Sequence, residues 1–115
     1  RVVAVFQPHR YTRTRDLLAD FFSAFNDADS LVITDIYPAG EEPIEGVSSN
    51  SLFEGIKAHG HKDVVYIPDR GEIIEYLVKH LSPGDLVVTL GAGDIWEVGE
   101  GLLEELDGGG EVREA

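Results

Sequence analysis

Short apolar runs alternate along the chain with longer stretches in which apolar residues recur every three or four positions. The runs at residues 2–6, 31–33, 64–67 and 86–90 predict four β-strands. Because the first run is almost continuously apolar, it is typical of a strand that is covered on both faces. The stretches between the runs have the spacing of amphipathic helices.

Residues 14–25 illustrate the helical spacing, since their apolar side chains form one stripe: Leu17, Leu18, Phe21, Phe22 and Phe25. Short polar residues before each helical stretch predict the N-caps. The candidates are Thr12 or Thr14 for the first helix, Ser51 for the second, Asp69 for the third and Asp94 for the fourth. Gly60 is expected to end the second helix.

The order of elements is therefore β-α-β-α-β-α-β-α. This order predicts the α/β class: a Rossmann-like three-layer sandwich with a mainly parallel sheet, strand order 3-2-1-4, and helices on both faces. Ligands of such folds bind beyond the carboxyl ends of the strands where the strand order reverses. Residues 7–15 and 91–94 are expected there. We expect one domain over residues 1–107 and a flexible polar tail over residues 108–115.

Composition narrows the possible partners. The 115 residues carry a net charge of −13 and contain no cysteine. Disulfides and thiolate metal sites are therefore excluded, which suits a cytoplasmic protein. So acidic a chain repels nucleic acid and anionic membranes, and no apolar run is long enough to span a bilayer. The sequence begins inside an expected strand, which suggests a segment of a longer protein.

The basic residues are unevenly distributed, because Arg10, Arg13 and Arg15 are three of only nine. Residues 6–15 contain no acid. Arg10 and Arg13, three positions apart, project to one side of a helical turn, and two guanidinium groups suit one small carboxylate. The alternative is that these arginines pair with surface carboxylates. His9 is either a hydrogen-bonded loop histidine or a general base.

The segment Gly91, Ala92, Gly93 and Asp94 begins like a dinucleotide-binding fingerprint, but Trp96 occupies the position of the third glycine. It is either a tight strand-to-helix turn or a wall of the binding cleft. The long loop at 35–49 is either a functional loop or a surface connection. His59 and His61 lack a third ligand, so we expect no metal site, and the chain carries no recognisable nucleophile motif.

The string Phe-Gln-Pro-His-Arg-Tyr-Thr-Arg-Thr at residues 6–14 resembles the C-terminal domain of the Mur ligases of peptidoglycan synthesis. The resemblance continues at residues 35–44, 46–48, 84–86 and 91–95. Within this family, the sequence resembles the branch that joins L-alanine to UDP-N-acetylmuramate. The resemblance implies that ATP phosphorylates the sugar carboxylate and that the alanine amine then attacks the acyl phosphate.

The resemblance also implies roles for individual residues. Arg10 and Arg13 would hold the alanine carboxylate, and His9 would line the same pocket. Other possible cleft-wall residues are Tyr11, Gly91, Ala92, Gly93 and Asp94. No catalytic residue is expected in this chain, since N-terminal and central domains would bind most of ATP and Mg²⁺. The isolated chain should therefore be inactive.

Three other functions stay open from the residues. The chain could belong to a related ligase for another amino acid or a peptide. It could be a stand-alone, non-catalytic module that binds a carboxylate or phosphate metabolite. It could also be half of a nucleotide-binding oxidoreductase, with Asp35 as the ribose-binding acid, although the broken glycine fingerprint disfavours this.

Overall fold

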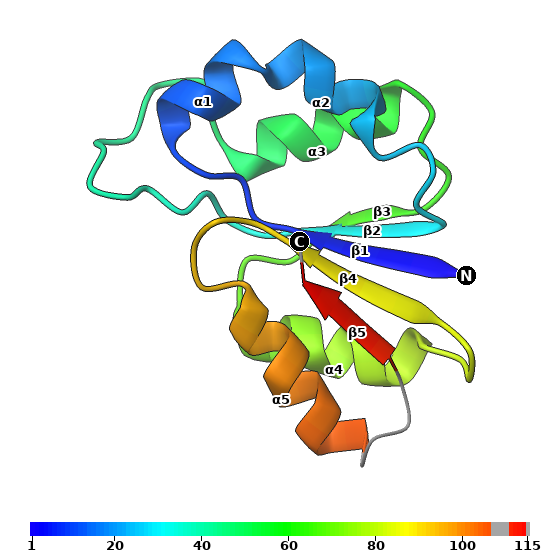
Figure 1. The fold of residues 1–115 in the computed structure, drawn as a ribbon. Coiled ribbons are helices and arrows are strands. Elements are labelled where there is room, and N and C mark those ends of the chain that lie inside the picture. Colours follow the sequence, from blue (N-terminus) through cyan, green and yellow to red (C-terminus); the bar gives the residue numbers. More distant parts are fainter. Residues whose placement is uncertain (107–110, 115) are drawn as a thin grey trace.

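The computed structural model describes residues 1–106 and 111–114 of the chain (Figure 1). The first half contains β1 (Val2–Phe6), α1 (Tyr11–Asp16), α2 (Leu18–Ala24), β2 (Ser30–Ile33) and α3 (Ser49–Ala58). The second half contains β3 (Val64–Tyr66), α4 (Arg70–His80), β4 (Leu86–Leu90), α5 (Trp96–Leu106) and β5 (Glu111–Glu114). The four predicted strands are therefore all present.

The strands form one sheet in the order β3-β2-β1-β4-β5, and every neighbouring pair is parallel. The predicted α/β class and the 3-2-1-4 strand order are confirmed. Helices α1, α2 and α3 cover one face of the sheet, and α4 and α5 cover the other (Figure 1). Because β1 is central, the loop that follows it lies between the loops that follow β2 and β4.

The strand β5 was not predicted. It lies within the segment expected to be a polar tail and pairs in parallel with β4, with Leu86 opposite Glu111. Its sequence, Glu-Val-Arg-Glu, contains a single apolar residue and so gives no periodic signal. Pairing with a neighbouring strand decides its conformation rather than local propensity. Residues 107–110 and 115 lie outside the described part, so the domain boundary at 107 stays a prediction.

Each face of the sheet has its own hydrophobic core. Towards α4 and α5, Val3 and Val5 pack in a cluster with Val32, Ile73, Leu77, Val87, Ile95, Val98 and Leu102. Towards α2 and α3, Ala4 packs with Ala28, Leu31, Ile33, Leu52 and Ile56. Successive residues of a strand point to opposite faces, so a strand between two cores is apolar throughout. This explains the continuous apolar run of β1.

The beginning of the first helix differs from the prediction. Helix α1 starts at Tyr11, after Arg10 in its N-cap position, and no side chain of its own caps it. Thr12 and Thr14 lie inside the helix, so their prediction as N-caps was wrong. The predicted single helix is also two, because the backbone departs from helical geometry at Leu17, with φ −106° and ψ 9°.

The later helix starts are closer to the prediction. Ser48, not Ser51, is the N-cap of α3, and Ser51 completes the capping box three residues later. Asp69 caps α4 as predicted, because its carboxylate accepts a hydrogen bond from the amide of Glu72. Gly60 follows α3 with φ 92°, the left-handed geometry expected at a helix end.

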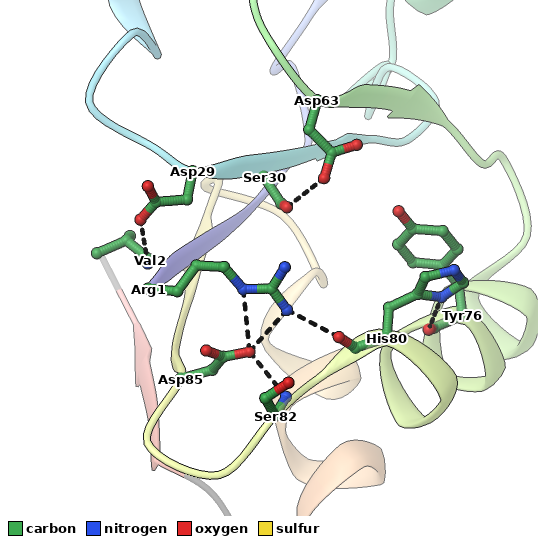
Figure 2. Close-up of polar contacts among 9 residues, drawn as sticks. All are labelled: Arg1, Val2, Asp29, Ser30, Asp63, Tyr76, His80, Ser82 and Asp85. Carbon is green, nitrogen blue, oxygen red and sulfur yellow. Dashed lines mark hydrogen bonds and ion pairs between the residues drawn. The ribbon is translucent and has the colours of Figure 1, made fainter.

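Side-chain contacts join the strands at the amino end of the sheet (Figure 2). The Arg1 guanidinium donates to the Asp85 carboxylate at 2.8 Å and to the carbonyl of His80 at 2.7 Å. Asp85 also accepts from the amide of Ser82 at 2.9 Å. The bond from Arg1, followed by that from Ser82, holds the pKa of Asp85 below its ordinary value. This end of the sheet is thus closed by internal contacts.

Candidate functional site

The loops after β1, β2 and β4 gather at the carboxyl end of the sheet, on the left in Figure 1. The first two are bonded to each other. The amide of Arg10 donates to the carbonyl of Tyr37 at 2.8 Å, and the amide of Tyr37 donates to the carbonyl of Pro8 at 2.8 Å. The rings of His9 and Tyr37 stack, with centroids 5.8 Å apart and planes 10° apart. The arginine loop, residues 7–10, therefore packs against the loop after β2 and is hydrogen-bonded to it.

Arg10 and Arg13 are both exposed and line one open cavity of about 520 Å³. Its other lining residues are His9, Thr12, Asp16 and Leu17. Within the described residues neither Arg10 nor Arg13 forms an ion pair, whereas Arg15 pairs with its neighbour Asp16 at 3.0 Å. The surface-pairing alternative therefore applies to Arg15. The other two guanidinium groups face solvent beside His9.

A smaller cavity of about 190 Å³ separates the arginine loop from the turn after β4. His9 and Arg13 line one side of it and Gly91 and Ala92 the other, above Phe6, Gln7 and Phe21. The structure thus brings four of the predicted site residues together. Tyr11, half-buried, lines neither this cavity nor the larger one around Arg10.

Gly93 allows a close approach between these loops. A Cβ atom at this position would lie 2.7 Å from Cγ of Tyr37 and 2.8 Å from Oε1 of Gln7. Gly91 is also close to Gln7, with a built Cβ 3.1 Å from its carbonyl oxygen. A side chain at Gly93 would therefore displace its neighbours, and one at Gly91 would be tightly packed, as the interpretation of a tight turn predicts. A role for the turn in binding substrate stays a prediction.

Asp94 joins three elements through its carboxylate. It accepts from Nε2 of Gln7 at 3.1 Å and from Nη2 of Arg70 at 2.6 Å. The bond from Gln7, followed by that from Arg70, lowers the pKa of Asp94. Arg70 also pairs with Glu97. The side chain of Asp94 thus fixes the turn to the arginine loop, and Arg70 offsets its charge.

Asp94 and Arg70 line a third cavity of about 360 Å³, together with Gln7, Thr34, Asp35, Ile36, Tyr37, Pro38, Pro68, Asp69 and Ile95. Asp35 accepts a hydrogen bond from the hydroxyl of Tyr66. Burial and this bond raise the pKa of Tyr66 to about 12. Asp35 therefore already has a hydrogen-bond partner in the protein, which disfavours the hypothesis that it binds a ribose.

Sequence reasoning missed Glu41, which reaches from the loop after β2 to the first turn of α1, next to the arginine loop. Its carboxylate accepts from the hydroxyl of Thr12 at 2.6 Å and from the amide of Thr12 at 3.1 Å. The bond from the hydroxyl and then that from the amide lower the pKa of Glu41. The long loop is thus fastened to the first turn of α1. Glu41 gave no sequence signal, because it is one of several acids in an irregular segment.

Histidine and carboxylate side chains are the candidate metal ligands of this chain. Within residues 1–106 and 111–114, no three histidine or carboxylate side chains come together as ligands. His59 and His61 instead contact the carbonyls of Gly55 and Phe25, at 2.9 Å and 3.0 Å. In the same described part, no helix has the length and apolar character to cross a membrane.

The parallel sheet, the helices on both of its faces and the exposed arginines at its carboxyl end define a Rossmann-like α/β domain with a cationic patch in an acidic protein. Residues 1–93 match the family described as Mur ligase, glutamate ligase domain. The chain belongs to this family.

Relatives of high identity share one printed name, UDP-N-acetylmuramate–L-alanine ligase. The protein of Geotalea uraniireducens (strain Rf4) is 57% identical over 108 residues, which are 94% of this chain and 24% of that protein. The protein of Geobacter sulfurreducens is 55% identical over 115 residues, 100% of this chain and 24% of its own length. That of Anaeromyxobacter dehalogenans (strain 2CP-C) is 57% identical over 107 residues, 93% and 23% respectively. The chain spans about a quarter of these relatives.

Proposed function

We propose that the chain is the C-terminal domain of a cytoplasmic ATP-dependent ligase that adds L-alanine to UDP-N-acetylmuramate in peptidoglycan synthesis. The printed names of the relatives support the reaction. The observation that carries the role of this domain is the pair of exposed guanidinium groups, Arg10 and Arg13, without an ion-pair partner in the described part of an otherwise acidic chain.

In this proposal Arg10 and Arg13 bind the carboxylate of the incoming amino acid. A guanidinium group presents parallel N–H donors that match the two oxygens of a carboxylate, and it stays charged at any physiological pH. His9 lines the same cavity, and its stacking on Tyr37 restricts its ring. The amino group of the bound amino acid would then point away from the arginines, towards the acyl phosphate.

The contribution of this domain is positioning. Holding a nucleophile in place removes the entropic cost of bringing two reactants together, which can reach roughly 7–11 kcal/mol in well-oriented systems. The residues of this chain carry no nucleophile or general base in the proposed reaction. The phosphates of ATP and the Mg²⁺ that accompanies them would be bound mostly by the N-terminal and central domains of the longer protein.

The test measures ADP release by the full-length ligase with UDP-N-acetylmuramate and a panel of amino acids. L-alanine should be the preferred amino acid. Arg10→Ala and Arg13→Ala should each raise its KM by about 10- to 100-fold, as expected when a charge-assisted hydrogen bond is removed. The KM for ATP should stay unchanged. Arg15→Ala is the matched control, because Arg15 is paired with Asp16.

If both variants behave like the unsubstituted enzyme, the arginines do not bind the amino acid. The family membership would then stand without the carboxylate-binding role. If another amino acid or a peptide is preferred, the domain belongs to a related ligase of the same family.

A further inference from the structure

We propose that Glu41 is a positioning residue, which holds the backbone of Arg10 in the conformation that presents its guanidinium group to the amino-acid carboxylate. This inference rests on the proposed function of Arg10. Three observations carry it: the backbone geometry of Arg10, the hydrogen bonds on both sides of that residue, and the way the loop after β2 delivers Glu41.

Arg10 has an unusual backbone conformation. Its φ is 67° and its ψ is 145°, a region that glycine enters readily and that a residue with a Cβ atom avoids. Such a residue persists only where the surrounding structure enforces its geometry, and strained residues of this kind cluster at functional sites. Any glycine could make this turn with less strain. The presence of arginine therefore indicates that the side chain itself is needed there.

Hydrogen bonds hold the backbone of Arg10 on both sides. Its amide donates to the carbonyl of Tyr37 at 2.8 Å. Its carbonyl accepts from the amide of Thr14 at 3.2 Å and from the hydroxyl of Thr14 at 2.8 Å. Thr14 is only 1% exposed, so this contact is shielded from water. Two of these bonds depend on the first turn of α1 being in place.

Glu41 fixes that first turn from outside. Both of its carboxylate oxygens are used by Thr12, one by the hydroxyl and one by the amide. Because α1 has no side-chain cap of its own, this carboxylate substitutes for one. Glu41 forms no ion pair with Arg10 or Arg13 in the described structure. It therefore orders the arginine loop and leaves the guanidinium groups available.

The loop after β2 has the geometry needed to bring Glu41 back to the sheet. Ala39 and Gly40 both have positive φ, at 50° and 88°. Two left-handed residues in succession reverse the chain, and the amide of Glu41 closes the turn on the carbonyl of Pro38 at 3.0 Å. Tyr37, just before the turn, is the residue that bonds to the amide of Arg10. One loop thus contacts both the arginine loop, through Tyr37, and the first turn of α1, through Glu41.

The experiment uses the full-length ligase and the ADP-release assay. Glu41→Gln removes the negative charge of the acceptor and should raise the KM for L-alanine by roughly tenfold. Thr12→Val removes the hydroxyl hydrogen bond and should also raise this KM. The KM for ATP and kcat should change little. Thr12→Ser keeps the hydroxyl and should behave like the unsubstituted enzyme. Glu42→Gln, at the exposed neighbouring residue, is the matched control.

A double variant separates positioning from general stability. Because Glu41 and Thr12 act on each other, Glu41→Gln combined with Thr12→Val should raise the KM by less than the product of the two single effects. The inference is overturned if Glu41→Gln and Thr12→Val lower the melting temperature but leave the KM for L-alanine unchanged. It is also overturned if they lower kcat with every KM intact. Thr12→Val still decides the question if Glu41→Gln does not fold.

Arg10→Ala, measured in the same series, distinguishes two failures. If Arg10→Ala raises the KM for L-alanine and Glu41→Gln does not, only the positioning role of Glu41 is wrong. If Arg10→Ala itself has no effect, the carboxylate-binding function proposed for Arg10 is wrong.

Discussion

At the scale of single residues, the backbone conformation of Arg10 and the role proposed for its side chain favour different amino acids. Its φ of 67° favours glycine, while the proposed site requires a guanidinium group. The sequence singled out Arg10 as a candidate binding residue, because Arg10, Arg13 and Arg15 lie close together within an acidic chain. It did not reveal the conformation, because the contacts that enforce it come from Tyr37 and Glu41, in a separate loop.

This opposition predicts that Arg10→Gly stabilises the domain and impairs the enzyme. Relief of the strained backbone should raise the free energy of unfolding, and the greater entropy of glycine in the unfolded chain offsets part of this gain, which leaves about 1 kcal/mol. The KM for L-alanine should rise as it does for Arg10→Ala. Urea denaturation and the ADP-release assay measure the two effects.

Arg10→Ala is the control for this prediction. It removes the guanidinium group but keeps the Cβ atom, so the strain remains and stability should not increase. Equal stability of Arg10→Gly and Arg10→Ala would mean that the turn stores no strain at this residue.

At the scale of elements, the sequence predicted the strands well and the helix starts less well. All four predicted strands are present, and in β1 burial on both faces leaves an unbroken apolar run. The start of α1 was misplaced because its cap, Glu41, is remote in sequence. Strand β5 was missed because pairing with β4, and no apolar pattern, defines it. Arg70 was missed for a similar reason, since its partner Asp94 follows a different strand.

The contact at the amino end of the sheet predicts how stability depends on pH. Arg1 and then Ser82 lower the pKa of Asp85, so the folded state favours the ionised carboxylate. The resulting stabilisation is complete above the unfolded pKa of about 3.9 and is lost as the pH falls through the lower folded value. Asp85→Asn should therefore destabilise the domain at neutral pH, and its difference from the unsubstituted chain should vanish in strong acid.

Urea denaturation across this pH range measures the effect. Asp27→Asn, at an exposed aspartate, is the control and should change stability little at any pH. A constant difference between Asp85→Asn and the unsubstituted chain from neutral pH into strong acid would show that ionisation of Asp85 does not contribute to folding.

At the scale of the whole molecule, the described part has two cores and a closed amino end, which are features of a self-contained folding unit. It also spans only about a quarter of its relatives. We therefore expect the isolated 115-residue chain to unfold cooperatively but to form no product. Circular dichroism on heating tests the folding, and ADP release with all three substrates tests the activity. Any product that depends on both ATP and L-alanine would show that this chain is sufficient for catalysis.

The central position of β1 has a consequence for synthesis on the ribosome. Val2 pairs with Leu86, so β1 cannot pair with β4, one of its two neighbours, until residues 86–90 have been translated. The turn after β4, which packs on Gln7, emerges later still. The arginine loop can therefore reach its final surroundings only after the turn that follows β4 has been translated. Until then β1 exposes an unpaired apolar edge, so the emerging chain is prone to aggregate and a chaperone would be most useful in this interval.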